Sequence, residues 1–205
     1  MAHDPSPWER LRLSTDRLCL RLPTPPDAAA LYELLADAAV MQGLGRPPVS
    51  AVEEVEAMIG DAIAGWRTEG LGPFLIETAT RGRRVVGQAG LMIFDERDWT
   101  PSTWRRAGRH AQPELGWALV QAHWGHGYAT EAAAAIRDWA HESRSIDRLV
   151  SLITPDNVRS QRVAERLGAR PAEVVTPPDS QRTAVVWRYP SPAEHSSTAR
   201  HAATP

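Results

Sequence analysis

Residues 114–143, ELGWALVQAHWGHGYATEAAAAIRDWAHES, decide the fold of this chain. The apolar run 114–120 predicts a strand, and the alanine-rich stretch from about Thr130 predicts a helix. Between them, the glycine-containing turn 123–129 places consecutive backbone N–H groups at a helix N-terminus, where the helix dipole adds partial positive charge. Such a turn suits a phosphate or pyrophosphate, and an ordinary tight turn is the plain alternative.

Outward from this segment, apolar periodicity and turn residues predict the other elements. Strands are expected at 17–22, 74–79, 84–94, 149–154, 172–176 and 183–189, and helices at 28–41, 51–67 and 157–169. Ser50, followed by Glu53, predicts a capping box. The order indicates an α+β domain over 14–190, after a lead-in at 1–13 and before a tail at 191–205 that is expected to be disordered.

Composition excludes several kinds of chemistry. The 205 residues are 42% hydrophobic, and all 23 basic residues are arginine. Without lysine there is no Schiff base, no pyridoxal phosphate attachment and no P-loop lysine. The single cysteine, Cys19, excludes a disulfide framework and a multi-cysteine metal site.

Charge and hydropathy limit the partners. The net charge of −2 argues against a nucleic-acid binder, which usually has a basic excess. No apolar run reaches the length of a membrane span, and the polar N-terminus is not a secretory signal. With one free cysteine, these features favour the cytoplasm, without membrane or nucleic-acid partners.

The segment 114–143, the strand 149–154 and the helix 157–169 together resemble the GNAT superfamily of acyl-CoA-dependent N-acetyltransferases. Within it, they look most like the branch of the ribosomal-protein N-terminal acetyltransferases. The family motif, Gln/Arg-x-x-Gly-x-Gly/Ala, is matched at Gly127 and Ala129, whereas Trp124 stands at its first position. The resemblance implies a mixed, mostly antiparallel sheet of about seven strands, splayed in the middle and flanked by four helices.

The same resemblance implies acetyl-CoA as co-substrate. Its pyrophosphate would lie on the turn, and its amide-rich arm would pair with the strand at the splay and bond an asparagine. In this chain the implied cofactor-binding residues are Trp117, Ala118, Leu119, Trp124, Gly125, His126, Gly127, Tyr128, Ala129, Thr130 and Asn157. Asn157 also suits a helix N-cap, and Thr130 could cap its helix or bond a phosphate oxygen.

Two residues are candidates for proton transfer. An amine must lose a proton to attack a thioester. The resemblance implies Glu114 as the base, with a water chain or a solvated strand-end carboxylate as alternatives. Glu131 is expected to face away or pack locally. The resemblance implies Ser160 as proton donor to the thiolate, with a surface helix serine as the alternative. Many members have a tyrosine one turn later, where this chain has Ala164, which favours Ser160 or water as the donor.

The remaining reactive side chains point away from other mechanisms. His110, His123 and His126 lack metal-ligand spacing, so no metal site is expected. Cys19 alternates with leucines in a strand, which favours a packed thiol over a nucleophile. The acetyl group is therefore expected to move directly to the amine, without an acyl-enzyme.

The sequence leaves the acceptor open. The loop 95–112 offers Trp99, Trp104, Arg105, Arg106 and Arg109, which either hold an acidic or planar group or cover the edge of the core. We expect a primary amine acceptor, either a protein N-terminus or a small molecule, and a monomer or homodimer. The alternatives are an antibiotic acetyltransferase and a non-catalytic CoA-binding sensor.

Overall fold

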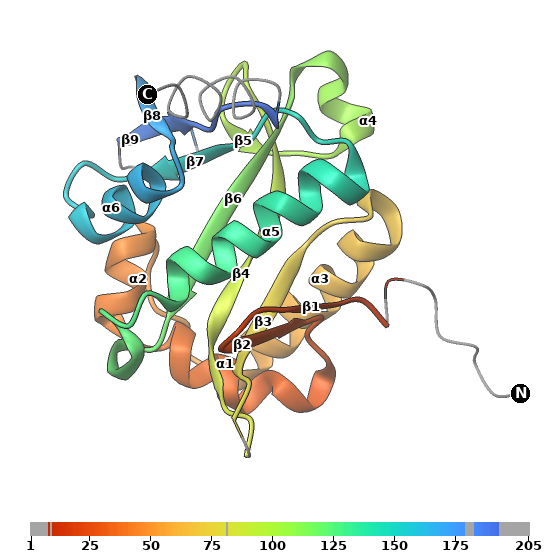
Figure 1. Ribbon diagram of the computed structural model, residues 1–205, viewed down its shortest axis with the longest axis vertical. Helices are drawn as coiled ribbons and strands as arrows, with labels where there is room; N and C mark the ends of the chain where they lie inside the picture. Colours follow the sequence, from red (N-terminus) through yellow and green to blue (C-terminus); the bar gives the residue numbers. More distant parts are fainter. Residues whose placement is uncertain (1–7, 9, 81, 179–182, 193–205) are drawn as a thin grey trace, which may run out of the picture. The chain divides into compact units, whose positions relative to one another are not determined.

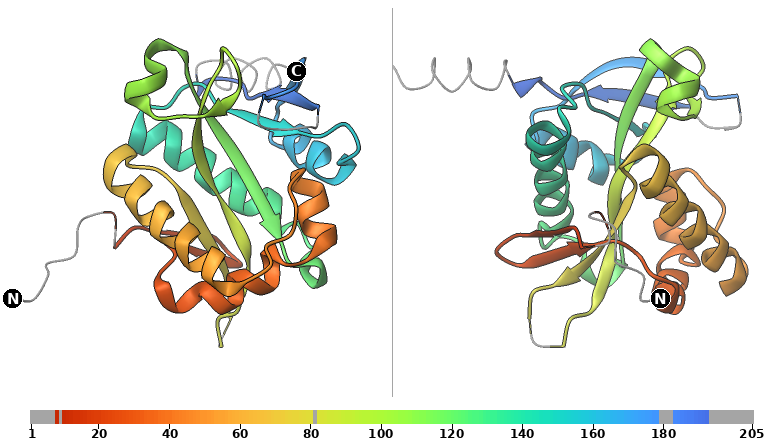
Figure 2. Two further views of the ribbon diagram at one scale, coloured as in Figure 1. Left: turned by 180° about the vertical axis from the view of Figure 1, so that it is seen from behind. Right: turned by 90° about the vertical axis from the view of Figure 1, so that its right-hand side faces the viewer.

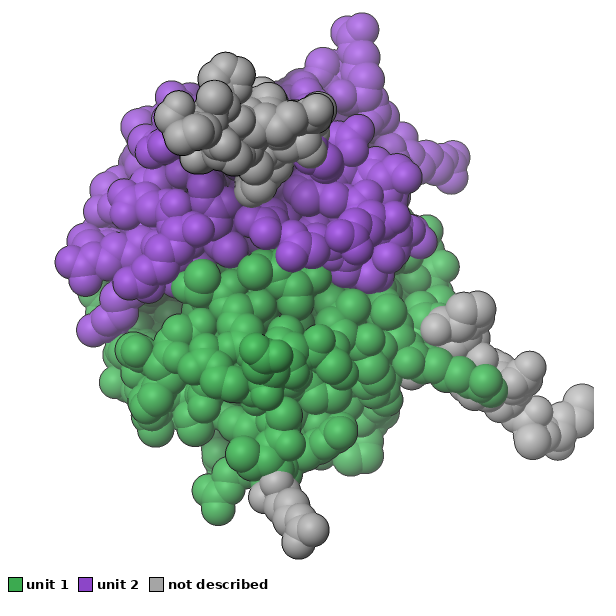
Figure 3. Space-filling view, in the orientation of Figure 1, with its two compact units in different colours: residues 1–92, 116–136 green, residues 93–115, 137–205 purple. Residues whose placement is uncertain are grey.

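The computed structural model describes residues 8, 10–80, 82–178 and 183–192 of the chain. It divides into two compact units (Figure 3). Unit 1 comprises Met1–Met92 and Gly116–Ile136, and unit 2 comprises Ile93–Leu115 and Arg137–Pro205. Three elements run from one unit into the other: β4 (Val85–Asp95), β6 (Ala111–Leu119) and α5 (Tyr128–Arg144) (Figure 1).

The strands of unit 1 follow the order β1-β2-β3-β4-β6. The first three are β1 (Arg12–Ser14), β2 (Leu18–Arg21) and β3 (Pro73–Thr78), each antiparallel to the next, as is β3 to β4. The strands expected at 17–22, 74–79 and 84–94 are confirmed, and the second and third of them form an antiparallel pair. Strand β1 begins inside the segment expected to be a lead-in, whereas residues 1–7 and 9 lie outside the described residues.

The expected helix at 28–41 is two helices, α1 (Ala28–Leu35) and α2 (Ala38–Leu44). The break has a local cause, because the Asp37 carboxylate accepts hydrogen bonds from the backbone N–H groups of Ala39 and Val40 and so caps a new helix. The next helix, α3 (Val52–Glu69), has Ala51 as its N-cap. Ser50 bonds Glu54 rather than Glu53, so the predicted capping box is wrong by one residue.

Helices α1 and α3 cover one face of the unit 1 sheet, and the N-terminal part of α5 lies on the other (Figure 2). Between the sheet and α1–α3 lies a core in which Leu34 and Val55 are almost wholly buried. Trp66 of α3 packs against β3, since its ring meets Phe74 edge to face at 4.9 Å and its indole N–H donates to the Pro73 carbonyl.

In unit 2 the strand order is β6-β7-β9-β8, and β5 pairs with the end of β4. Among the described strand pairs of this unit, β6–β7 is parallel, and β7–β9 and β8–β9 are antiparallel. The elements are β5 (Thr100–Pro101), α4 (Trp104–Ala107), β7 (Val150–Ile153), α6 (Val158–Arg166), β8 (Arg170–Val175) and β9 (Ala184–Arg188). The described part of the chain also contains three short 3-10 turns, Pro25–Asp27, Gly108–His110 and Gln121–His123.

The α+β class and a mixed, mostly antiparallel sheet are confirmed. The described residues form nine strands and six α-helices, against about seven and four expected. The additions are short, namely β1, β5, α4 and the split of the first helix. No helix in the described ranges is long and apolar enough to cross a membrane. Most of the expected tail, 193–205, lies outside the described residues.

Gly87 in β4 marks a close approach of two strands in unit 1. A Cβ there would lie 2.2 Å from the Ala118 carbonyl oxygen and 2.9 Å from the Leu119 Cα. Main-chain atoms cannot swing aside, so Gly87→Ala should lower the free energy of unfolding by about 1–3 kcal/mol in urea titrations. Gly60→Ala, in α3 with no atom within 4 Å, is the control and should raise it by about 0.5–1 kcal/mol. Equal effects of the two substitutions would contradict this packing.

Candidate active site

The turn between β6 and α5, in unit 1, contains two left-handed glycines. Gly125 and Gly127 each have a φ of 80°, which residues with a Cβ adopt only with strain. The hydrogen bond from Glu131 N to the Gly127 carbonyl, at 3.0 Å, opens the helix. The backbone N–H groups of residues 128–130 precede that bond and therefore have no acceptor within the helix. The turn and the helix start thus present backbone donors, as an anion site requires.

Helix α5 begins at Tyr128, two residues earlier than expected. Thr130 therefore lies within the first turn and does not cap the helix, which corrects that alternative. Its hydroxyl oxygen is buried without a hydrogen-bond partner among the described residues. A bond from Thr130 to a phosphate oxygen remains a prediction.

Trp124, which departs from the family motif, anchors the turn. Its indole N–H donates to the Leu119 carbonyl at 2.8 Å, and its backbone N–H donates to the Gln121 carbonyl at 3.0 Å. The ring packs against the core under α1–α3. The side chain is thus committed to fixing the turn on the end of β6.

Arg17, the residue just before β2, contacts the outer side of the turn. Its guanidinium donates to the His126 carbonyl at 2.9 Å and to the Glu131 carboxylate at 2.6 Å, and lies 4.9 Å from the centre of the Tyr128 ring. Thr15 donates to the same carboxylate at 2.5 Å. We call Thr15, Arg17 and Glu131 the turn clamp. The sequence interpretation missed Thr15 and Arg17, because their partners lie more than a hundred residues away.

Glu131 packs locally against Thr15 and Arg17, which is one of the two arrangements expected from the sequence. Burial alone would raise its pKa, but the hydrogen bonds from Thr15 and Arg17 outweigh burial and lower the pKa below its ordinary value of 4.5. The carboxylate is therefore charged at neutral pH and engaged with its clamp partners, which leaves it unsuited to accept a proton from a substrate.

The three candidate histidines have separate surroundings. His123, His126 and Tyr128 form an aromatic group on the turn, in which the His126 and Tyr128 rings stack at 5.8 Å. The His126 Nδ1 donates to the Trp124 carbonyl at 2.9 Å. His110, in unit 2, lies 3.2 Å from the Glu96 carboxylate. No cluster of three or more histidine, cysteine or acidic side chains suited to a metal occurs in the described ranges.

In unit 2, β6 and β7 pair at a single position, Glu114 opposite Val150. Beyond it, the Leu152 N–H donates to the Glu114 Oε1 at 3.4 Å instead of to a backbone carbonyl. The Leu115 carbonyl accepts a hydrogen bond from the Ser151 hydroxyl at 2.5 Å. Side chains thus replace the ladder of backbone bonds, and the strands separate as the resemblance implied.

Tyr189, just after β9, joins this arrangement. Its hydroxyl lies 2.9 Å from the Ser151 Oγ, and its backbone N–H donates to the Leu149 carbonyl at 3.0 Å. Burial raises the pKa of the Tyr189 phenol, and the charge of Glu114 raises it further, so the phenol stays protonated. The sequence interpretation missed both hydroxyl residues, since a serine and a tyrosine in strands carry no local signal.

The other predicted residues lie on two elements. Asn157 is the N-cap of α6, and its Oδ1 accepts from the Ser160 N–H at 3.1 Å, which confirms the capping role. Ser160 lies in the first turn of the same helix. Trp117, Ala118 and Leu119 lie in the part of β6 that belongs to unit 1, where the Leu119 carbonyl already accepts the Trp124 indole. Their contacts with a cofactor remain predictions.

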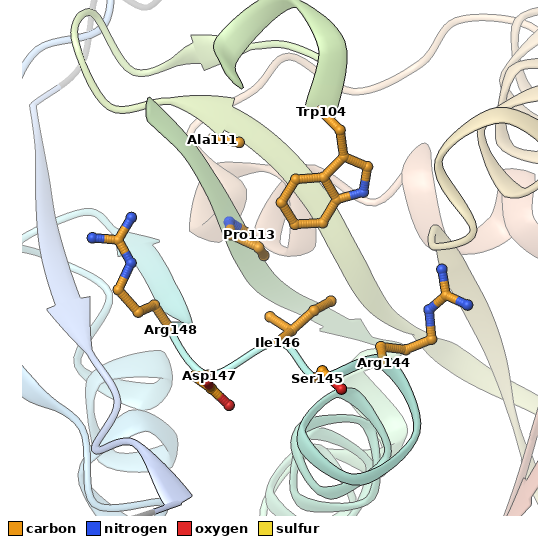
Figure 4. Close-up of a pocket in the computed structure, with 8 residues that line it drawn as sticks. All are labelled: Trp104, Ala111, Pro113, Arg144, Ser145, Ile146, Asp147 and Arg148. Carbon is orange, nitrogen blue, oxygen red and sulfur yellow. The ribbon is translucent and has the colours of Figure 1, made fainter. Parts of the chain in front are cut away.

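The loop 95–112 contains β5, α4 and a 3-10 turn rather than irregular chain throughout. Trp99 is buried with Phe94 and Val150, so for this residue the core-edge alternative holds. Trp104, by contrast, lines a hollow of about 530 Å³ in unit 2. Figure 4 shows Arg144 and Arg148 on opposite sides of Ile146 in the wall of this hollow.

The family described as Acetyltransferase (GNAT) domain matches residues 17–170, well over half of the chain and all of the turn, the clamp residue Arg17 and the parting strands. The chain belongs to the GNAT acetyltransferases. It is therefore an enzyme of the acyltransferase class.

Solved structures share the fold of this GNAT acetyltransferase. An acetyltransferase from Agrobacterium tumefaciens is 30% identical, with a TM-score of 0.69 over 87% of this chain and 94% of that one. A proposed ribosomal-protein-serine acetyltransferase from Vibrio cholerae is 20% identical, with a TM-score of 0.69 over 88% and 97%. AAC(6')-Ib, solved with ribostamycin and coenzyme A, is 19% identical, with a TM-score of 0.69 over 89% and 98%.

Replacing Glu131 by glutamine tests the turn clamp. At pH 7 the free energy of unfolding should fall by about 1 kcal/mol. The effect is modest because the Arg17 side chain is half exposed, so that solvent screens the ion pair. Since the folded pKa lies below 4.5, the carboxylate stabilises the fold above pH 4.5, and this contribution is lost as the pH falls through the folded pKa. Urea unfolding of both proteins at pH 7 and pH 3 should show the difference shrinking.

The matched control is Glu142→Gln, an exposed carboxylate of the same helix. It should change the free energy of unfolding by less than about 0.5 kcal/mol at either pH. A difference for Glu131→Gln that is as large at pH 3 as at pH 7 would show that its pKa is not lowered.

Proposed function

We propose that this acyltransferase moves an acetyl group from acetyl-CoA to a primary amine, in the cytoplasm. The observation that carries the cofactor assignment is the turn, in which two left-handed glycines precede the free N–H groups of α5. Backbone donors at a helix N-terminus bind pyrophosphate oxygens without a cationic side chain. AAC(6')-Ib, which shares the fold, was solved with coenzyme A.

The transfer would be direct. The amine nitrogen attacks the thioester carbonyl carbon, the C–S bond breaks, and the amine proton goes to Glu114 or to a water chain that leads to it. The departing thiolate takes up a proton, for which Ser160 or water is the proposed donor. Cys19 is 6% exposed within β2, and its Sγ lies 3.6 Å from the Arg83 guanidinium. An acyl-enzyme would need an accessible nucleophile, and this thiol is buried.

Glu114 suits its proposed role better than Glu131 does. The Glu114 side chain is partly exposed and accepts a long hydrogen bond from the Leu152 N–H at 3.4 Å, whereas the Glu131 carboxylate is bonded to the Arg17 guanidinium. A carboxylate that is bonded to a guanidinium has a lowered pKa and accepts a proton less readily, which argues against Glu131 as the base.

For the acceptor, we propose the α-amine at a protein N-terminus, as in the ribosomal-protein branch. The turn segment, the strand 149–154 and the helix 157–169 resemble that branch. The Vibrio cholerae structure has the same fold and that description. A small amine such as an aminoglycoside is the alternative, since AAC(6')-Ib binds ribostamycin on the same fold.

A thiol-release assay tests the function. The protein is incubated with acetyl-CoA and a panel of peptides with free N-termini, aminoglycosides and simple primary amines, and products are weighed by mass spectrometry. We expect saturable thiol release with peptides, each product gaining one acetyl group at the α-amine. Activity confined to aminoglycosides would contradict the protein N-terminus as acceptor and support the small-amine alternative. Tight CoA binding by calorimetry, without thiol release from acetyl-CoA in the presence of any amine, would contradict acetyl transfer and favour a CoA-binding module.

Gly127→Val tests the placement of the pyrophosphate. Valine at a φ of 80° is strained, and its Cβ would also lie 3.4 Å from the Arg17 guanidinium, so the turn should lose its shape. CoA affinity, measured by calorimetry, should fall at least about a hundredfold, as expected when several phosphate hydrogen bonds are lost together.

The control is Gly108→Val, which has a φ of 57° and open space around its Cβ. It also places a Cβ at a positive φ, at the end of α4, and should leave CoA affinity within about twofold. CoA binding that survives Gly127→Val in a folded protein would contradict the placement.

A further inference from the structure

The separation of β6 and β7 depends on a chain of buried hydroxyl groups. Ser151 is 1% exposed and Tyr189 is 7% exposed. The Ser151 Oγ lies 2.5 Å from the Leu115 carbonyl oxygen and 2.9 Å from the Tyr189 hydroxyl. We call Tyr189, Ser151 and the Leu115 carbonyl the hydroxyl chain. All three lie in unit 2, together with Glu114.

The direction of the hydrogen bonds in this chain follows from the number of protons. A carbonyl oxygen only accepts, so the single Ser151 proton is used on Leu115. The Tyr189 hydroxyl must then donate to Ser151, which agrees with a phenol that burial keeps protonated. The hydroxyl chain therefore has one arrangement of donors, ending on the residue next to Glu114.

Glu114 is fixed on one side by the hydroxyl chain and on the other by β7. The residue after it in β6 carries the carbonyl that Ser151 holds, and its own carboxylate accepts from Leu152. Ser151 and Leu152 are neighbours in β7, so two adjacent residues bind β6 through different atoms. Loss of the Ser151 bond would free the Leu115 carbonyl to turn, and the Glu114 carboxylate would turn with it.

The surroundings add two charges. Glu114 from β6 and Arg137 from α5 both act on the Tyr189 phenol, the first raising and the second lowering its pKa. The Arg137 guanidinium is itself occupied by Asp138 and by the Leu167 carbonyl. The phenol is thus a neutral donor beside a carboxylate, and it keeps its proton near neutral pH.

We propose that Tyr189 and Ser151 are positioning residues, whose hydroxyl chain holds the Glu114 carboxylate in the orientation that accepts the amine proton. The proposal rests on the proposed function, in which Glu114 is the base. Neither hydroxyl touches the reacting atoms, and each acts through the backbone of β6.

A double-mutant cycle tests the proposal, using thiol release from acetyl-CoA with the most active amine of the panel. Tyr189→Phe and Ser151→Ala should each lower kcat by about tenfold and change KM for acetyl-CoA less than twofold, as expected when a reacting group loses its orientation. Glu114→Gln should lower kcat by more. In the Glu114→Gln background, Tyr189→Phe should lower kcat less than twofold further, because the group it positions is gone.

The control is Tyr32→Phe, which removes a hydroxyl that bonds the exposed Ser50 carbonyl in unit 1. It should leave kcat unchanged. Thermal unfolding identifies the variants that fold. If either Ser151→Ala or Tyr189→Phe does not fold, the other one carries the test. Multiplicative losses in the double mutant would overturn the positioning role while leaving the base in place. An unchanged kcat for Glu114→Gln would overturn both, whereas thiol release by the unaltered protein would still support acetyl transfer.

Hydrogen exchange of the Leu152 amide gives a second readout that needs no acceptor. This amide donates to Glu114, so it should exchange about tenfold faster in Tyr189→Phe than in the unaltered protein if the carboxylate loses its position. The Tyr189 N–H bond to Leu149 lies on the backbone and should keep its protection in the same variant. Unchanged exchange at Leu152 would overturn the proposal.

Discussion

The separation of β6 from β7 after one pair of residues is the constraint on which the rest of unit 2 depends. Two parallel strands that lie side by side normally continue their ladder of backbone bonds. Here the next donor and acceptor, on Leu152 and Leu115, are satisfied by the Glu114 carboxylate and the Ser151 hydroxyl. Buried backbone groups must find hydrogen-bond partners, and these two side chains supply partners for the groups that the separation removes from the ladder. The candidate base is therefore also one of the groups that keep the strands apart.

The other end of β6 is organised in unit 1 by close packing. Gly87 lets the backbone of β4 approach Ala118 and Leu119, and the Trp124 ring returns to bond the Leu119 carbonyl. The glycines of the turn then reverse the chain into α5, and Arg17 binds the turn through His126 and Glu131. Trp124 departs from the family motif, and its side chain anchors the turn on the Leu119 carbonyl. Anion binding at the turn is then left to the backbone N–H groups.

Local patterns predicted most of this fold. The strands at 17–22, 74–79 and 84–94 and the turn at 123–129 each depend on residues near one another in sequence, and each was found where expected. The first helix was predicted as one because its alanines continue past Asp37, whose capping bonds outweigh propensity. Arg17, Ser151 and Tyr189 were missed since their roles exist only through partners that folding brings near. Asn157 was found because a helix cap is a local feature.

The turn clamp has a consequence for regulation. The guanidinium nearest the turn is already neutralised by Glu131, and the chain has no lysine, so an anion at this turn would be held by peptide dipoles. Peptide dipoles neither titrate nor accept covalent modification. Capture of such an anion would stay constant where a lysine-based site would weaken on acetylation, which suits a protein that works among activated acetyl donors. Control over its activity would then have to act on the acceptor side or on the strands that part at Glu114.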